Sequence, residues 1–139
     1  MQKGDLDQIV NIERMSFLSP WKWEHFQSEL EKDFGISIIA EVDQFIVGYL
    51  IGWFVANEIH IGNIAVHPKW RRKGIGEMMI QKLLTEYKSC SLVQLEVRFS
   101  NRAARSLYRK LGFYEIGIRK NYYTFEREDA VLMEKRLSI

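Results

Sequence analysis

Residues 63–76, NIAVHPKWRRKGIG, join the end of an apolar strand to the beginning of a helix. Residues 59–66 are rich in β-branched side chains and predict the strand, which ends at His67 and Pro68 because proline cannot donate to a strand ladder. After Gly76, apolar side chains recur at helical spacing to about residue 88. The stretch therefore predicts a strand, a loop and a helix in succession.

The loop of this unit, Arg71-Arg72-Lys73-Gly74-Ile75-Gly76, has the composition of a polyphosphate-binding turn. Its glycines allow a tight turn and close approach of a ligand, and the first helical turn offers unpaired N–H donors at the positive end of the helix dipole. The loop does not end in the Gly-Lys-Ser/Thr of a Walker loop, and it lacks the Gly-x-Gly-x-x-Gly pattern of a dinucleotide-binding fold. The spacing alone leaves an ordinary basic turn equally open.

On both sides of this unit the chain alternates between helical and strand patterns. Helices are expected over residues 6–17, 23–32 and 101–111, with Asn101 as an N-cap and Gly112 after the last turn. Strands are expected over residues 36–42 and 45–55, which form a hairpin, and over 93–98, 113–119 and 130–136. The order ααβββαβαββ predicts an α/β fold in a single domain over residues 1–139, with one mixed sheet covered by helices.

Composition indicates one globular domain in a reducing compartment. The chain has 139 residues, 47% of them hydrophobic, which is enough to bury one core without disulfides or metals. Cys90, the single cysteine, cannot form an intramolecular disulfide. The N-terminal residues lack the apolar segment of a signal peptide, and the longest apolar run, residues 45–56, is too short to cross a membrane. We therefore expect a cytoplasmic protein with no membrane partner.

Charge is divided unevenly along the chain. Residues 1–58 hold four Lys/Arg against ten Asp/Glu, whereas residues 59–139 hold sixteen against eight. An anionic ligand is therefore expected to bind the second half. A basic half that also carries tyrosines could bind nucleic acid by phosphate contacts and stacking, but no nucleic-acid-binding motif accompanies it, and nucleic acid is the less favoured partner.

Two side chains, Glu96 and His60, could accept a proton. Glu96 lies on the polar face of the strand predicted over residues 93–98, where it could be a general base, a solvated strand residue or the ion-pair partner of Arg98. His60, on the strand before the loop, is a competing base. Tyr108 falls on the apolar stripe of its helix, so core packing with a satisfied hydroxyl is the simpler interpretation. The three histidines are scattered along the chain, and no metal site is expected.

Residues 63–76 resemble the acetyl-CoA motif of the GNAT superfamily of N-acetyltransferases, with its Arg/Gln-x-x-Gly-x-Gly/Ala core. Later segments resemble its RimI-type branch, which acetylates the N-terminal alanine of a small-subunit ribosomal protein. The resemblance covers residues 5–136, and the segments that narrow it to this branch are Leu95-Glu96-Val97-Arg98-Phe99-Ser100-Asn101, Ala104, Leu107-Tyr108-Arg109-Lys110-Leu111-Gly112-Phe113, Arg119-Lys120-Asn121-Tyr122-Tyr123 and Glu128-Asp129-Ala130. One departure is at the start: the strand that the family has before Asp5 must be short or trimmed here.

The resemblance implies a cosubstrate, a substrate and roles for particular residues. Acetyl-CoA would be bound through the backbone amides of residues 72–77 around the pyrophosphate, through a strand edge along the pantetheine arm and through the Asn101 side chain. The acetyl-CoA-binding residues implied are Ile64, Ala65, Val66, Arg71, Arg72, Lys73, Gly74, Ile75, Gly76, Glu77 and Asn101. An acceptor protein N-terminus would lie near His60, Tyr122 and Tyr123, with Glu128 as a further candidate.

By the same resemblance, Glu96 would be the general base and Tyr108 the general acid that protonates the coenzyme A thiolate. No motif suggests activation of Cys90, so direct transfer in a ternary complex is expected rather than an acyl-cysteine intermediate. An α-amine, whose reference pKa is about 7.7–8.0, is roughly 3.5 kcal/mol easier to deprotonate at neutral pH than a lysine. A lysine or small-amine acetyltransferase, and a non-catalytic acyl-CoA-binding or nucleic-acid-binding module, remain open alternatives.

Overall fold

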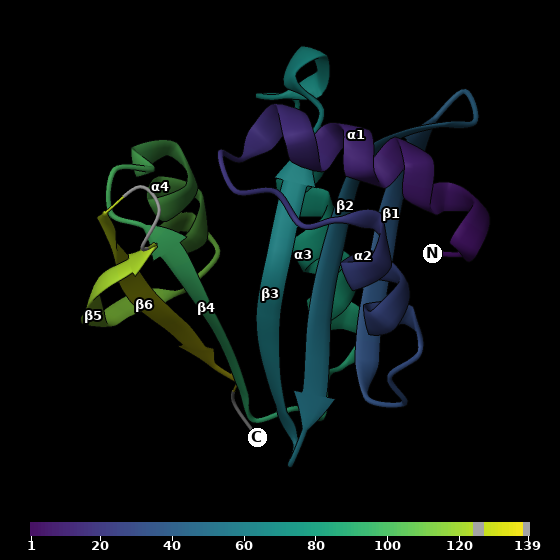
Figure 1. The fold of residues 1–139 in the computed structure, drawn as a ribbon. Helices are drawn as coiled ribbons and strands as arrows, with labels where there is room; N and C mark the ends of the chain where they lie inside the picture. The colour runs from purple at the N-terminus through teal and green to yellow at the C-terminus, as the bar shows by residue number, and fades with distance from the viewer. Residues whose placement is uncertain (124–126, 138–139) are drawn as a thin grey trace.

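The computed structural model describes residues 1–123 and 127–137 and has helices on both faces of one six-stranded sheet (Figure 1). The predicted order ααβββαβαββ is confirmed. The helices are α1 (Leu6–Ser16), α2 (Trp23–Leu30), α3 (Ile75–Glu86) and α4 (Arg102–Lys110), and the strands are β1 (Gly35–Val42), β2 (Phe45–Val55), β3 (Glu58–Val66), β4 (Leu92–Arg98), β5 (Tyr114–Tyr123) and β6 (Glu128–Arg136).

The structure differs from the sequence-based expectation at three places. Lys3–Asp5 forms a 3-10 turn, where the resemblance implied a shortened strand, and a second 3-10 turn, Pro68–Trp70, follows β3. Strand β5 continues to Tyr123, beyond the expected end at residue 119, because it pairs with β6 as far as Glu128. Lys120 and Asn121 interrupt the strand pattern before the two tyrosines, and the pairing with β6 defines the extension.

The sheet has the order β1-β2-β3-β4-β6-β5, and β3 and β4 are its one parallel pair. The expected hairpin of β1 and β2 is confirmed. Pairing between β3 and β4 ends at Ile61 opposite Leu95, although both strands continue. Beyond this pair the two strands diverge, as Figure 1 shows between the teal β3 and the green β4. The divergence leaves backbone of both strands available inside the sheet.

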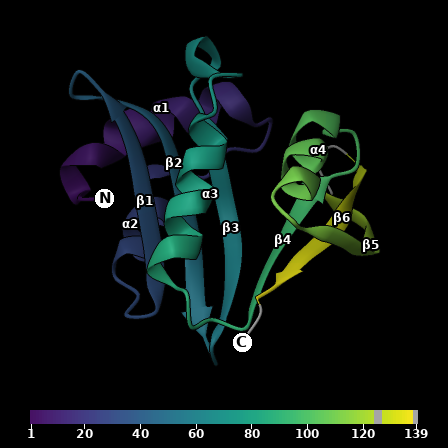
Figure 2. The same cartoon turned by 180° about the vertical axis from the view of Figure 1, so that it is seen from behind.

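Each face of the sheet carries its own helices and its own core. Seen from behind, α3 and α4 lie in front of the sheet, whereas α1 and α2 cover the opposite face (Figure 2). The core under α3 and α4 includes Val93, Leu95 and Val97 of β4, and the core under α1 and α2 includes Ile46 and Tyr49 of β2. Because side chains alternate along a strand, the residues between the three apolar positions of β4 point toward the α1–α2 side.

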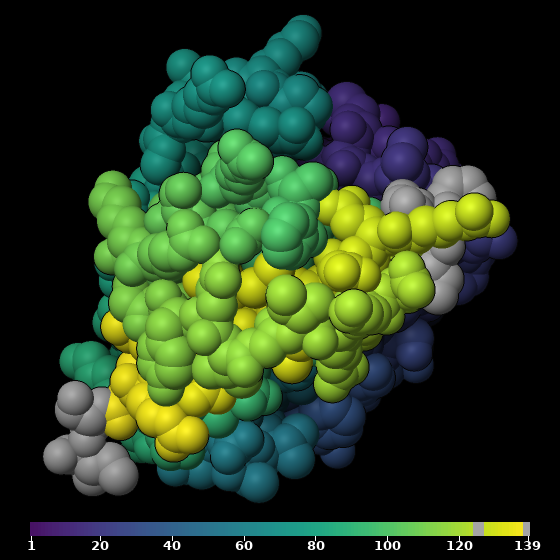
Figure 3. Space-filling view, turned by 90° about the vertical axis from the view of Figure 1, so that its left-hand side faces the viewer, coloured from purple at the N-terminus to yellow at the C-terminus, as the bar shows by residue number. Residues whose placement is uncertain are grey.

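On the side of the molecule that carries β4, the surface is formed largely by α4 and β5, as the space-filling view shows (Figure 3). Strand β5 is at the edge of the sheet and is exposed along its length except at Tyr123. Over the residues that the structure describes, no helix has the length and apolar character needed to span a bilayer.

Candidate active site

A cavity of about 330 Å³ lies where β3 and β4 diverge. Its walls come from both strands, from α4, from the segment between α1 and α2 and from the end of β5. The lining residues are Glu13, Phe17, Ser19, Trp21, Ile61, Gly62, Asn63, Ile64, Leu95, Glu96, Val97, Arg98, Asn101, Ala104, Tyr108, Tyr122 and Tyr123. The cavity therefore brings together Glu96, Tyr108, Asn101 and the two tyrosines that the sequence predicted as site residues.

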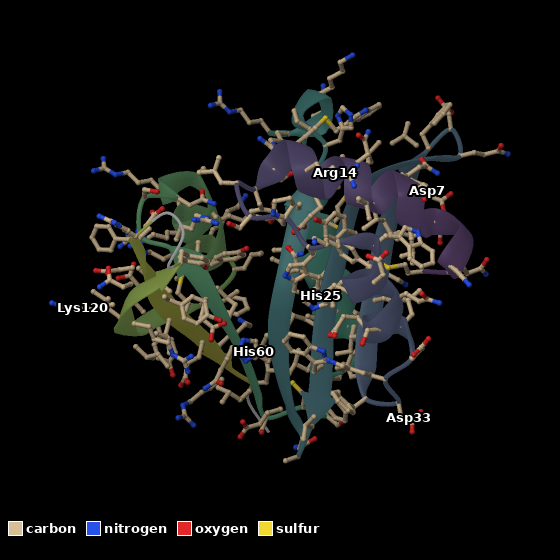
Figure 4. The ribbon with its side chains drawn as sticks, in the orientation of Figure 1. Asp7, Arg14, His25, Asp33, His60 and Lys120 are labelled. Atoms are coloured by element: carbon tan, nitrogen blue, oxygen red, sulfur yellow. The ribbon has the colours of Figure 1, made fainter. Side chains whose placement is uncertain are left out.

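The two competing bases, Glu96 and His60, are hydrogen-bonded to each other, with His60 Nε2 2.6 Å from Glu96 Oε2. His60 comes from β3 and Glu96 from β4, and Figure 4 shows the labelled His60 between these strands. The Glu96 side chain is 10% exposed and the His60 side chain 39%. Glu96 lines the cavity, and His60, which is more exposed, is in direct hydrogen-bond contact with it.

Arg98 has partners other than Glu96. Its guanidinium lies 4.2 Å from the centre of the Tyr123 ring, and its Nη1 is 3.7 Å from Glu128 Oε2. Glu128 also accepts a hydrogen bond from the backbone N–H of Ser100 at 2.8 Å. Within the described part of the chain, the ion-pair partner of Glu96 is His60, so the sequence alternative of an Arg98–Glu96 pair is wrong. Glu128 thus contacts both the Ser100 backbone and Arg98, and Arg98 lines the cavity.

Tyr108 is buried in α4 and packs against Phe113, with ring centres 5.8 Å apart. Its hydroxyl has no hydrogen-bond partner among the described residues, yet no buried side-chain nitrogen or oxygen there is unsatisfied. The hydroxyl is therefore reached from the cavity that Tyr108 lines. Burial raises the pKa of Tyr108, and the neighbouring Tyr123 adds to the effect. The ring is packed as the pattern indicated, the hydroxyl is not satisfied by a described protein group but faces the cavity, and the role of general acid stays a prediction.

Tyr122 and Tyr123 end β5 at the rim of the cavity, with their rings edge to face at 5.1 Å. Tyr122 is exposed, whereas Tyr123 is partly buried between Tyr122 and Arg98. Burial raises the pKa of Tyr123 to about 12, against the opposing effect of Arg98. The two rings provide an aromatic surface beside Glu96. The Tyr122 ring is exposed, and the Tyr123 ring is held between Tyr122 and Arg98.

Beyond Ile61, β3 pairs with β2 on one side and has no strand partner among the described residues on the side of β4. Ile64 and Val66 pack toward the α3–α4 core and Ala65 toward the α1–α2 core, so the side chains are used for packing and the backbone edge faces the gap. A strand edge of this kind can pair with an extended ligand that carries amide groups.

The basic loop lies beyond the cavity, at the N-terminus of α3. Gly74 has φ +80°, a value that favours glycine, and α3 begins after it without a side-chain cap, so its first N–H groups are available to a ligand. Arg72 is also in the left-handed region, at φ +63°. Among the loop side chains, Arg71 bonds inward, from Nε to the Val66 carbonyl at 2.9 Å and from Nη2 to Ser16 Oγ at 3.1 Å. Arg71 therefore ties the loop to β3 and α1.

Two other predicted acetyl-CoA-binding residues have structural partners. Asn101 accepts the N–H of Ala104 at 3.2 Å, which confirms it as the N-cap of α4, and it also lines the cavity. Glu77, in the first turn of α3, is 3.3 Å from Lys110 Nζ of α4 and links the two helices on this face.

Residues 6–113 match the sequence model of the Acetyltransferase (GNAT) family. The chain belongs to the GNAT family. A candidate ribosomal protein bS18-alanine N-acetyltransferase of Bacillus subtilis is 39% identical, with 96% of this chain and 90% of that protein covered. The ribosomal protein bS18-alanine N-acetyltransferase of Escherichia coli is 33% identical over all of this chain and 96% of its own.

Solved structures agree with this assignment. The crystal structure of the Escherichia coli ribosomal-protein-S18-alanine N-acetyltransferase superposes with a TM-score of 0.92 at 33% identity, covering all of this chain and 92% of that one. Ard1 from Thermoplasma volcanium, at 22% identity and a TM-score of 0.93 over all of this chain and 95% of its own, shares the fold. The chain is thus an N-acetyltransferase of the RimI type, and the predicted mixed, mostly antiparallel GNAT sheet is confirmed.

In this GNAT enzyme, sequence reasoning missed the side of the cavity that Glu13, Trp21 and Asn63 form. Glu13 of α1 is only 1% exposed and accepts hydrogen bonds from the Asn63 side chain and the Trp21 backbone. The sequence did carry a signal for Glu13. It falls among the apolar positions of the first helix, and a glutamate buried there needs hydrogen-bond partners. Cys90, by contrast, is a buried core residue, and burial raises the pKa of its thiol.

Proposed function

We propose that this enzyme transfers the acetyl group of acetyl-CoA to the N-terminal α-amine of a protein, with an alanine at the start of a ribosomal protein as the acceptor. The observation that carries the proposal is the cavity between β3 and β4, which holds Glu96 and Tyr108 together next to an unpaired strand edge. The names of the Escherichia coli and Salmonella relatives support the choice of acceptor. Ribosomal proteins are made in the cytoplasm, and we place the enzyme there.

Acetyl-CoA would enter along the gap between the diverging strands. The N-terminus of α3 and the turn at Gly74 would hold its pyrophosphate, and the backbone edge of Ile64, Ala65 and Val66 would pair with the amides of its pantetheine arm. Lys73 and Arg72 are exposed on the same loop and add positive charge. Bound in this way, the thioester supplies the activated acetyl group at the cavity.

Glu96 would take the proton from the acceptor ammonium, and the neutral amine would attack the acetyl carbonyl carbon. The new C–N bond forms, the C–S bond breaks, and the sulfur leaves with the bonding electron pair. Tyr108 would donate its proton to this thiolate, since its raised pKa keeps the hydroxyl protonated. The nitrogen loses a second proton as the amide forms, and the Tyr108 oxygen takes up a proton again, so that one proton is released overall. His60, 2.6 Å from Glu96 and more exposed, is placed to pass the first proton to solvent.

The residues favour direct transfer to an α-amine. Cys90 is buried in the core and does not line the cavity, which argues against an acyl-cysteine intermediate. A single carboxylate–imidazole base suits an amine with a reference pKa of about 7.7–8.0 better than a lysine, whose reference pKa is about 10.4. Tyr122 and Tyr123 would cover the first residues of the acceptor peptide.

Transfer from acetyl-CoA to synthetic peptides tests the proposal. We expect acetylation of a ribosomal protein N-terminal peptide that begins with a free alanine, and none when the same α-amine is blocked and only lysines remain. Transfer to the blocked peptide would establish a lysine acetyltransferase instead. Binding of acetyl-CoA without transfer to any peptide or small amine would show a non-catalytic module.

A further inference from the structure

Glu13 is a buried carboxylate with neutral partners. It lies near the end of α1, is 1% exposed and lines the cavity. Its Oε1 accepts the Asn63 Nδ2–H at 2.8 Å and the Tyr49 hydroxyl proton, and its Oε2 accepts the Trp21 backbone N–H at 2.9 Å. Among the described residues, Glu13 has no Lys, Arg or His in ion-pair contact.

The three donors indicate the charge of this group. The Asn63 amide N–H and the Trp21 backbone N–H can only donate, and the Tyr49 hydroxyl can donate as well, so the ionised, acceptor-only form accommodates all three contacts. Hydrogen bonds to an ionised acceptor are about twice as strong as neutral ones. A buried charge without such partners would be strongly unfavourable. Glu13 therefore holds its three neighbours firmly.

Those neighbours form the side of the cavity opposite α4. Trp21 belongs to the segment between α1 and α2, which contributes Phe17 and Ser19 to the same wall. Asn63 directly follows Gly62, the extra residue of a β-bulge in β3, at the point where β3 leaves β4. One carboxylate thus ties the α1–α2 segment to the diverging part of β3.

We propose that Glu13 is a positioning residue for the acceptor peptide: it holds Trp21 and Asn63 so that the wall facing Glu96 and Tyr108 is already formed before the acceptor binds. The inference rests on the proposed acetyl transfer to a peptide. The Glu13 side chain has its oxygens occupied and acts through its neighbours. Its loss is expected to weaken acceptor binding more than acetyl-CoA binding.

Glu13→Met tests this because methionine has nearly the volume of glutamate and no strong acceptor. We expect the KM for the peptide to rise roughly tenfold or more, with the KM for acetyl-CoA changed less than twofold, since hydrogen bonds to charged groups are the stronger class. Amide hydrogen exchange at Trp21 should accelerate by a similar factor. Tyr49→Phe is the matched control: it removes one donor and leaves the bonds to Trp21 and Asn63, so both readouts should stay close to wild type.

If Glu13→Met does not fold, Glu13→Gln retains one acceptor oxygen and should show an intermediate rise in the peptide KM. An unchanged peptide KM and unchanged Trp21 exchange in the variant that folds would overturn the inference. So would equal rises in both KM values, which indicate general distortion. Failure of the wild-type enzyme to acetylate any peptide would remove the proposed function, while the Trp21 exchange would still report on the tether.

Discussion

Glu96 and Tyr108 face one cavity from different surroundings. Glu96 is 10% exposed and hydrogen-bonded to an imidazole that reaches solvent, so a proton can leave it. Tyr108 is buried and has no hydrogen-bond partner among the described residues, which favours its protonated form. When two groups in one site have such different environments, their pKa values move apart, and one can accept a proton while the other donates one.

Replacement of Tyr108 by Phe should lower kcat by about 100-fold, in the range of a lost general acid, with little change in the KM for acetyl-CoA. Because burial raises the pKa of Tyr108, its hydroxyl stays protonated through the usual range of tyrosine titration. We therefore expect the wild-type kcat not to decline between pH 8 and pH 10. A pH profile of both proteins measures this, and a decline centred below pH 9 that disappears in the variant would contradict the assignment.

Replacement of Glu96 by Gln should lower kcat by about 100-fold or more while acetyl-CoA still binds. Gln94→Ala is the matched control, because Gln94 lies on the same face of β4 but hydrogen-bonds Glu134 outside the cavity. His60→Gln should have a smaller effect than Glu96→Gln, since His60 contacts the base rather than the amine. Steady-state kinetics with a peptide acceptor give the three values, and a larger loss in His60→Gln would make His60 the base.

At the scale of elements, the bulge in β3 depends on a close fit between strands. Ile51 pairs with Asn63 and Gly52 with Ile61, so Gly62 is the extra residue. A Cβ atom at Gly62 would overlap the indole of Trp53, which lies across it. Trp53 in turn donates from Nε1 to Glu29 at 2.9 Å. The bulge thus connects β2 and α2 to the point where the cavity begins.

Gly62→Ala should therefore destabilise the fold by about 1–3 kcal/mol, the usual effect of overpacking. In a Trp53→Leu background, where the indole is gone, the same substitution should be much less destabilising. Urea unfolding of the single and double variants measures the coupling. Equal losses in both backgrounds would show that Trp53 does not set the requirement for glycine.

The loop before α3 makes different demands on its two glycines. Gly74 has φ +80°, so Gly74→Ala should be destabilising by about 1 kcal/mol and should weaken acetyl-CoA binding. A Cβ at Gly76 would lie 3.6 Å from Leu107, an ordinary contact, and alanine favours helix, so Gly76→Ala should leave the fold at least as stable. Thermal unfolding and acetyl-CoA titration compare the two variants. Equal stability losses would disprove the distinction.

At the scale of the whole molecule, buried tyrosines couple stability to alkaline pH. Burial raises the pKa of Tyr49, with a further contribution from Glu13, and burial also raises the pKa of Tyr108 and of Tyr123. A raised folded-state pKa gives stability that is present below the unfolded value, about 10, and is lost as pH rises above it. We therefore expect the free energy of unfolding to hold steady between pH 7 and pH 9 and to fall above pH 10.

Each such tyrosine contributes a slope of about 1.4 kcal/mol per pH unit above its unfolded pKa. Tyr49→Phe should therefore flatten the alkaline decline by about that amount while lowering stability at pH 7. Urea unfolding at several pH values gives both slopes. Parallel curves for the variant and the wild type would show that Tyr49 is not a source of the alkaline instability.

Local patterns were sufficient for the elements of this fold. The alternation in β4, the apolar stripe and Asn101 cap of α4 and the glycines before α3 each depend on neighbours in sequence, and all three elements form where expected. The extension of β5 escaped prediction because Lys120 and Asn121 interrupt the strand pattern before Tyr122 and Tyr123, and the pairing of Tyr123 with Glu128 of β6 defines the strand there. Resemblance to the family indicated which polar residues are candidates for the site.

The sequence by itself determined the order of the elements, the glycine-containing basic loop at the start of α3 and the GNAT family of the chain. Only the tertiary structure decided that His60 and Glu96 form one unit and that Glu13 reaches Asn63, pairs that are 36 and 50 residues apart. The physical reason is that helix and strand periodicity are local, whereas these contacts arise where β3 and β4 separate and α1 crosses the sheet. The divergence of two strands has no signature within either strand alone.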